Sequence, residues 1–322
     1  MELNVIVNQL KSLLTSEDSN KEIEQFLQET QHPSKWMLYS DYCLDDKDKP
    51  NNVITFVMVP FVSIDKYLEL ERKIKETQPK DIKESKDISL EFSSLIKNTR
   101  CYSFTFIIEK RKELFGKTGK ERQKSVKEIL EHLRDQFTTW LNNETQNKLV
   151  EYYKDTIKKL RNQIIKVDQN KSLKDLMDIF LITIIGALVS SAFLKNLPKI
   201  DIFGWFPDRD KTNESCDKIA VPLFNAYQYN LLNGVQYQFV SSVPDSKVKP
   251  FYDEYNRIAD IICGTIADFN FKDNLISKDK FNSVLQNLIA DNSYIKIYRI
   301  FSDEDKYKLS EIKISNSPIE NI

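Results

Sequence analysis

Apolar residues along the chain follow two spacings, one typical of strands and one typical of helices. Apolar and aromatic runs predict strands at 36–42, 53–62, 101–108, 200–206 and 235–241. The run 53–62 is apolar at nearly every position, which is typical of a strand buried on both faces. The first two strands flank a polar turn at 44–52, so we expect them to form a hairpin.

The segments before, between and after these strands have apolar residues at helical spacing. This spacing predicts helices at 3–30, 63–77, 87–98, 120–166, 172–196, 213–232 and 251–269, with a turn at 142–145 breaking the fourth. A helix at 279–290 and a hairpin at 294–314 are expected to follow. Strands that alternate with helices indicate an α/β fold.

Composition bounds the organisation of the chain. With 322 residues, 41% of them hydrophobic, and only 6 Gly, it can bury a large core and has no long flexible linker. We expect an N-terminal helical segment at 1–34, a core domain at 35–271 and a C-terminal helix-and-hairpin extension at 272–322. The helices at about 120–196 exceed what the predicted core needs and are interpreted as an insertion.

No membrane-spanning or secreted segment is predicted. The most apolar stretch, 179–194, is shorter than the roughly 20 residues of a membrane span, so it is interpreted as a buried core helix. The N-terminus lacks the features of a signal peptide. The four cysteines are widely spaced and are expected to be free thiols in a reducing compartment, which places the protein in the cytoplasm.

Candidate chemistry depends on carboxylates, because the chain has only two histidines. That number excludes a His-rich metal site and most Ser-His-Asp schemes. Asp41 ends the first predicted strand, and Asp208 and Asp210 follow the fourth, with Asp208 preferred because it is nearer the strand. Asp260 lies between apolar neighbours on a predicted core helix, where a carboxylate is costly to bury without a partner. A salt bridge, a solvated edge position and a cation ligand all remain open for it.

Four short motifs occur in a suggestive order between residues 35 and 270. They are Tyr39-Ser-Asp-Tyr-Cys-Leu-Asp-Asp46, Lys80-Asp-Ile-Lys-Glu-Ser-Lys86, Trp205-Phe-Pro-Asp-Arg-Asp210 and Ile258-Ala-Asp-Ile-Ile-Cys-Gly264, the last preceded by Val243-Pro-Asp-Ser-Lys247. In order and rough spacing they resemble the RNase H-like family catalogued as domain of unknown function 3800. That family has an acidic turn after its first strand, a Glu-Ile-Lys-like motif, a strand that ends in Asp and a late Ala-Asp-Leu-Ile-Ala-Gly-like helix.

The resemblance implies a fold and an activity. The fold is an RNase H-like mixed five-stranded sheet flanked by helices, and the activity is divalent-metal-dependent nuclease chemistry. Asp41, Asp81, Asp208 and Asp260 would hold two Mg²⁺ or Mn²⁺ ions, which prefer oxygen ligands, and Lys83 would steady the phosphate. Two departures from the family pattern are Tyr42, where an acidic residue is usual, and Asp81, where Glu is usual. The alternative is therefore an inactive RNase H-like protein that binds nucleic acid or protein.

Partners follow from this interpretation. The expected substrate or ligand is a nucleic acid, either DNA or RNA. The basic stretch 110–122 is interpreted as an ordinary surface loop, with a nucleic-acid-tracking loop as the second interpretation. The helical insertion is the expected surface for a protein partner or a homodimer.

Overall fold

The computed structural model describes residues 2–208, 214–242, 251–304 and 306–316. Contacts divide the chain into two compact units. The helical unit comprises Met1–Ser12, Lys110–Ser191 and Arg209–Gly234. The sheet unit comprises Leu13–Glu109, Ala192–Asp208 and Val235–Ile322. Each unit is described by itself.

The sheet unit is built on one large mixed sheet. Its strands are β1 Lys35–Cys43, β2 Val53–Pro60, β3 Tyr102–Ile108, β4 Ile202–Pro207, β5 Gln238–Ser241, β8 Ile295–Asp303 and β9 Lys306–Ile312, in the spatial order β5-β4-β1-β2-β3-β8-β9. β1, β2 and β3 are antiparallel neighbours, while β4 is parallel to β1 and β5 is parallel to β4. The carboxyl ends of β1 and β4 therefore lie at the same edge of the sheet.

The sheet has seven strands, so the prediction of five was wrong in number. The C-terminal hairpin β8–β9, expected to be an extension, joins the sheet because β8 pairs in parallel with the free edge of β3. An unpaired edge leaves backbone donors and acceptors without partners, and the hairpin satisfies those of β3. Local sequence patterns predicted the hairpin but could not indicate its distant partner.

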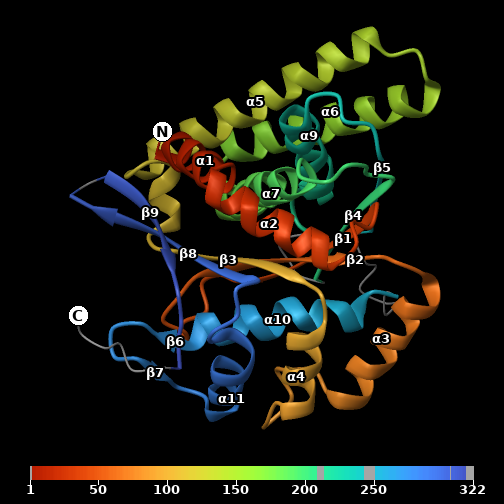
Figure 1. Ribbon diagram of the computed structural model, residues 1–322. Coiled ribbons are helices and arrows are strands. Elements are labelled where there is room, and N and C mark those ends of the chain that lie inside the picture. Colours follow the sequence, from red (N-terminus) through yellow and green to blue (C-terminus); the bar gives the residue numbers. More distant parts are fainter. Residues whose placement is uncertain (1, 209–213, 243–250, 305, 317–322) are drawn as a thin grey trace. The chain divides into compact units, whose positions relative to one another are not determined.

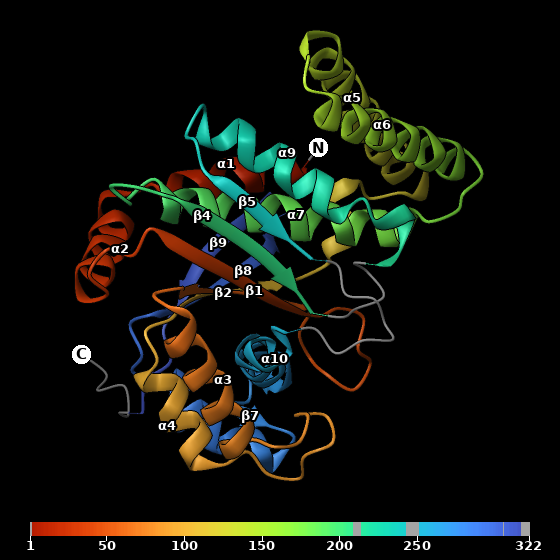
Figure 2. The same cartoon turned by 90° about the vertical axis from the view of Figure 1, so that its right-hand side faces the viewer.

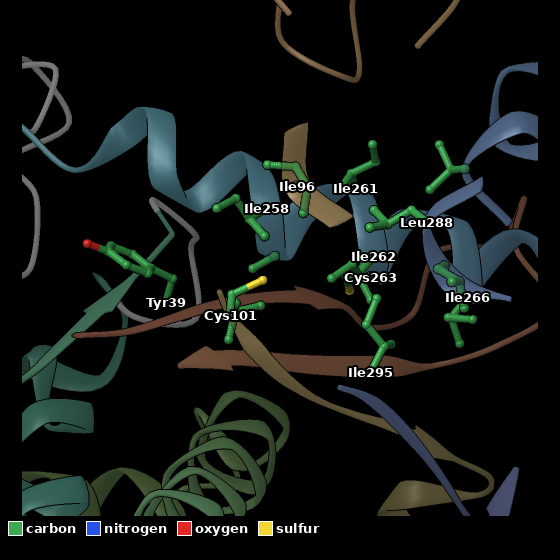
Figure 3. Packing of buried hydrophobic residues seen from close by; sticks show 14 of the residues in the cluster. Tyr39, Ile96, Cys101, Ile258, Ile261, Ile262, Cys263, Ile266, Leu288 and Ile295 are labelled. Atoms are coloured by element: carbon green, nitrogen blue, oxygen red, sulfur yellow. The ribbon is translucent and has the colours of Figure 1, made fainter. Parts of the chain in front are cut away.

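Helices cover both faces of this sheet (Figures 1 and 2). On one face, Phe26 of α2, Glu17–Glu29, packs against Trp36 and Tyr102. The other face carries α3 Ile64–Thr77, α4 Leu90–Asn98 and α10 Asp253–Asp268, followed by the short segments β6 Phe269–Asn270, β7 Leu275–Ile276, η3 Asp279–Phe281, α11 Asn282–Val284 and η4 Leu285–Ile289. Figure 3 shows part of the core between α10 and the strands, including Ile262, Ile266 and Ile295. Packing in this core sets the distance between α10 and β1.

The helical unit contains α5 Gly119–Asn143, α6 Asn147–Asp168 and α9 Ala220–Leu232, with the 3₁₀ segments η1 Arg111–Phe115 and η2 Cys216–Lys218. It also contains most of α1 Glu2–Leu14 and of α7 Leu173–Leu194, whose last residues belong to the sheet unit. A capping box between Thr118 and Glu121 begins α5. Residues 144–146 separate α5 from α6, as the predicted turn required.

α7 is long and apolar enough to cross a membrane by composition. Its most apolar window, however, is 94% buried within the protein. A helix that is apolar all round and buried is typical of the core of a soluble protein.

The basic stretch 110–122 differs from the expected surface loop. It begins with η1, in which the Arg111 side chain is buried and donates hydrogen bonds to the Asp178 carboxylate of α7. The positive charge of Arg111 is therefore neutralised within the helical unit.

Candidate functional site

Asp41 lies on the face of β1 that packs against α10. Alternate strand residues share a face, so Tyr39, Asp41 and Cys43 all face this helix. The ring of Tyr39 stacks on that of Tyr255, with centroids 5.2 Å apart, while Asp41 and Cys43 both interact with the Cys263 thiol. Tyr39 to Cys43 spans four residues of strand, and Tyr255 to Cys263 spans eight residues of helix. Both spans advance about 12–13 Å, so the contacts at the two ends can form together. The buried Asp41 is thereby held opposite the middle of α10.

Asp208 is positioned beside Asp41 by the pairing of β4 with β1. Its backbone N–H donates a hydrogen bond to the carbonyl oxygen of Ser40 at 2.9 Å. Two residues earlier, Phe206 stacks on Tyr39 on the α10 side of the sheet. The other candidate, Asp210, and the polar segment 243–247 lie outside the described residues.

Asp81 lies in the loop between α3 and α4. Its carboxylate accepts a hydrogen bond from the backbone N–H of Lys83 at 2.8 Å, which closes a tight turn. The loop is anchored by buried Ile82 and by Lys280, whose ammonium donates to the carbonyl oxygens of Ile82 at 2.5 Å and Ser85 at 3.1 Å. The Arg257 guanidinium of α10 also donates to the carbonyl oxygen of Gln78. These contacts hold the exposed Asp81 and Lys83 near α10.

The five residues predicted as a site act on one another electrostatically. Burial, with the negative charges of Asp41, Asp81 and Asp208, raises the pKa of Asp260 well above its usual range, and Lys83 partly offsets this rise. Desolvation lowers the pKa of Lys83, but the same four carboxylates outweigh it and raise that pKa to about 12. The structure therefore places Asp41, Asp81 and Asp208 within electrostatic range of both Asp260 and Lys83.

The raised pKa of Asp260 predicts a pH-dependent stability. Because the pKa is higher in the folded state than in the unfolded state, this contribution is complete at low pH and is lost as pH rises through the folded-state pKa. An asparagine side chain stays neutral at every pH, so we expect Asp260→Asn to raise the melting temperature above pH 6 and to leave it unchanged near pH 3. Thermal melts in chelator across pH 3–9 test this.

A matched control is Asp253→Asn, seven residues earlier on the same helix and about 10 Å away along its axis. Its difference from wild type should not grow between pH 6 and 9. A melting temperature of Asp260→Asn at or below that of wild type at pH 8 would show that Asp260 is not destabilised by its charged neighbours.

Sequence reasoning did not identify several residues near these carboxylates. Lys280 interacts with Asp260, Asp81 and Lys49, and its pKa is lowered chiefly by burial. Lys49 interacts with the Cys43 and Cys263 thiols, whose pKa values burial raises, so both sulfurs stay protonated. Lys280 is distant in sequence from the predicted motifs, and no spacing pattern could have connected it to them.

The donor types suit a hard divalent cation, because carboxylate oxygens are the ligands that Mg²⁺ and Mn²⁺ prefer. Within the described ranges, however, no three His, Cys, Asp or Glu side chains lie close enough together to hold a metal ion. The residues therefore suit such an ion in donor type, but their side chains are not positioned to coordinate it in the described residues.

Comparison of the chain with protein-family models, with curated proteins and with solved structures found no match.

Proposed function

We propose that the sheet unit is an RNase H-like domain. The first five strands form a contiguous mixed sheet in which three antiparallel strands are followed by two parallel ones. Candidate carboxylates lie on the first strand, just after the fourth and on the helix after the fifth. This order supports the resemblance to the family catalogued as domain of unknown function 3800. The β8–β9 hairpin is an addition at the edge of β3.

We infer that the carboxylate cluster serves divalent-metal-dependent cleavage of a nucleic acid. One observation carries this inference: Asp41, Asp81 and Asp208, from three other segments, add to burial in raising the pKa of Asp260, against the opposing charge of Lys83. A buried carboxylate without a compensating partner is costly, and ligands of open α/β sheets bind beside the carboxyl ends of the parallel strands, where Asp41 and Asp208 lie. Lys49, Lys83 and Lys280 add the positive charge that a phosphodiester substrate requires.

Asp41, Asp81, Asp208 and Asp260 would hold Mg²⁺ or Mn²⁺. When bound, such an ion lowers the pKa of an attacking water and stabilises the charge that develops on phosphate oxygens. The chain itself supplies rigidity and charge. Asp41 is buried in the sheet, Asp208 is fixed through its backbone, and Lys83 can donate hydrogen bonds to a phosphate oxygen. Asp260 keeps its proton to higher pH than an ordinary aspartate until positive charge is added beside it.

An inactive protein that binds nucleic acid or protein is the second candidate. It is favoured by the position of Lys83, whose positive charge already compensates part of the carboxylate cluster. It also agrees with the separation of these carboxylates in the described residues. In this case the lysines would bind an acidic partner without cleavage.

Calorimetric titration with Mn²⁺ distinguishes the two candidates. We expect wild type to bind Mn²⁺ and both Asp208→Asn and Asp260→Asn to lose at least about 90% of the affinity, because each removes one charged ligand from a shared site. Asp253→Asn serves as the matched control and should bind like wild type. Asp210→Asn, measured in parallel, tests the choice of Asp208 over Asp210.

Failure of wild type to bind Mn²⁺, with and without a short nucleic acid, would reject the metal-dependent function and favour the binding protein. Wild-type affinity in Asp208→Asn together with loss in Asp210→Asn would transfer the ligand role to Asp210. Wild-type affinity in Asp260→Asn would place any bound ion elsewhere.

A further inference from the structure

Five aromatic side chains surround a cavity of about 350 Å³ in the helical unit. They are Phe137 and Trp140 of α5, Tyr152 and Tyr153 of α6, and Tyr229 of α9. Trp140 lies at the centre of this aromatic cluster, with its ring 5.3 Å from that of Tyr229 and 6.0 Å from that of Tyr153. The cavity lies near the C-terminal end of α5, well separated in sequence from the carboxylate cluster.

The electrostatics of this cavity favour a positive ligand. Its described lining residues include the carboxylate of Glu144 but no lysine, arginine or histidine. Glu144 is the C-cap residue of α5 and adds a negative charge to the lining. Aromatic faces are also negative and attract cations, especially those with weakly hydrated alkyl surfaces.

Contacts around the cavity hold it in shape. Glu144 accepts hydrogen bonds from the backbone N–H groups of Thr145 and Gln146, both at 2.9 Å, which directs its carboxylate. Asn225 of α9 bonds to Tyr152, and Gln136 of α5 donates to Asn230 of α9 at 2.8 Å. The three helices are thus joined by polar contacts beside the cavity, so they need not collapse to fill it.

We propose that this aromatic cavity binds an alkylated ammonium group, either of a small molecule such as choline or of a methylated lysine side chain. Rings that only served to close a core would pack without a cavity, and a site for a neutral apolar ligand would not need an acidic residue in its lining. The half-buried Trp140 and the exposed Tyr229 leave the rings accessible from solvent. This inference is independent of the carboxylate cluster and of its proposed function.

The test compares choline with its neutral isostere 3,3-dimethyl-1-butanol, using saturation-transfer NMR of the ligand methyl groups with the full chain. We expect saturable choline binding and at least about tenfold weaker binding of the isostere, because only the cation interacts with the ring faces and Glu144. Trp140→Ala should weaken choline binding about tenfold, and Glu144→Gln about threefold. A peptide that carries trimethyl-lysine, titrated in parallel, distinguishes the two sources of the group by its affinity relative to choline.

Trp140→Phe keeps a ring and controls for collapse of the cavity, and helical circular dichroism checks the fold of each variant. Equal binding of choline and the neutral isostere would reduce the site to an ordinary apolar cavity and overturn the proposal. Unchanged choline affinity in a folded Trp140→Ala variant, or no binding of choline and peptide to wild type, would also overturn it.

Discussion

Asp41→Asn should abolish the proposed metal-dependent cleavage of nucleic acid, lowering its rate by about a thousandfold or more. Asp41 is a buried member of the carboxylate cluster, and β2 and β4 flank β1 on both sides within the sheet. An amide of the same shape preserves packing but removes the charge that would hold a divalent cation. The measurement is the cleavage rate of single- and double-stranded DNA and RNA in Mn²⁺, with chelator as the blank.

Cys43→Ser is the matched control, since Cys43 lies two residues further along the same face of β1. It should retain the wild-type rate within about threefold, because the Cys43 thiol is not a proposed ligand. Wild-type cleavage in a folded Asp41→Asn variant would exclude Asp41 from the site or expose a contaminating nuclease. Absence of cleavage by wild type on all four substrates would favour the binding protein instead.

The elements that the sequence predicted well are those with strong local patterns. The apolar run of β2 and the aromatic run of β3 were placed within two residues of their observed bounds. Ser63, the first residue of the predicted helix 63–77, accepts a hydrogen bond from the backbone N–H of Lys66 and caps α3. Local periodicity carries this information because buried and exposed positions recur at a fixed spacing within each helix or strand.

Part of the candidate site was predictable from the sequence. The signals were acidic residues at the ends of predicted strands and one carboxylate on an otherwise apolar helix segment. Asp41 and Asp208 were indicated by their positions at the ends of predicted strands, and Asp260 by its position among apolar neighbours. The structure brings these residues, Asp81 and Lys83 together, while their roles stay predictions. Lys280 was not predictable, because only the folding of a distant segment places it against the Asp81 loop.

Arg111 shows the same limit for charge. It lies among lysines in a stretch whose sequence is typical of a solvated loop, and nothing in the nearby sequence indicates its ion-pair partner. Its partner Asp178 comes 67 residues later, on the apolar α7. A long-range ion pair of this kind has no periodic signal, so sequence patterns identify buried apolar residues more readily than buried charges.

Arg111→Met should destabilise the helical unit by about 3–5 kcal/mol. The Arg111 and Asp178 side chains are 3% and 8% exposed, and their hydrogen bonds include Nε to Oδ1 at 2.7 Å and Nη2 to Oδ2 at 3.0 Å. Methionine fills much of the space but leaves Asp178 charged, buried and without this partner. The double variant Arg111→Met/Asp178→Leu removes both charges and should recover most of the lost free energy of unfolding, since apolar packing often replaces a buried pair at little cost.

Chemical denaturation followed by circular dichroism measures these differences, with Lys127→Met as the matched control. Lys127 pairs with Asp168 at 2.8 Å in the same unit, but both side chains are substantially exposed, so its loss should lower the free energy of unfolding far less than the loss of Arg111 does. The ratio between the two single variants is the informative quantity, because it separates a buried charge from a screened one. Equal losses in Arg111→Met and Lys127→Met, or a double variant no more stable than Arg111→Met, would show that desolvation of Asp178 does not control the stability of this unit.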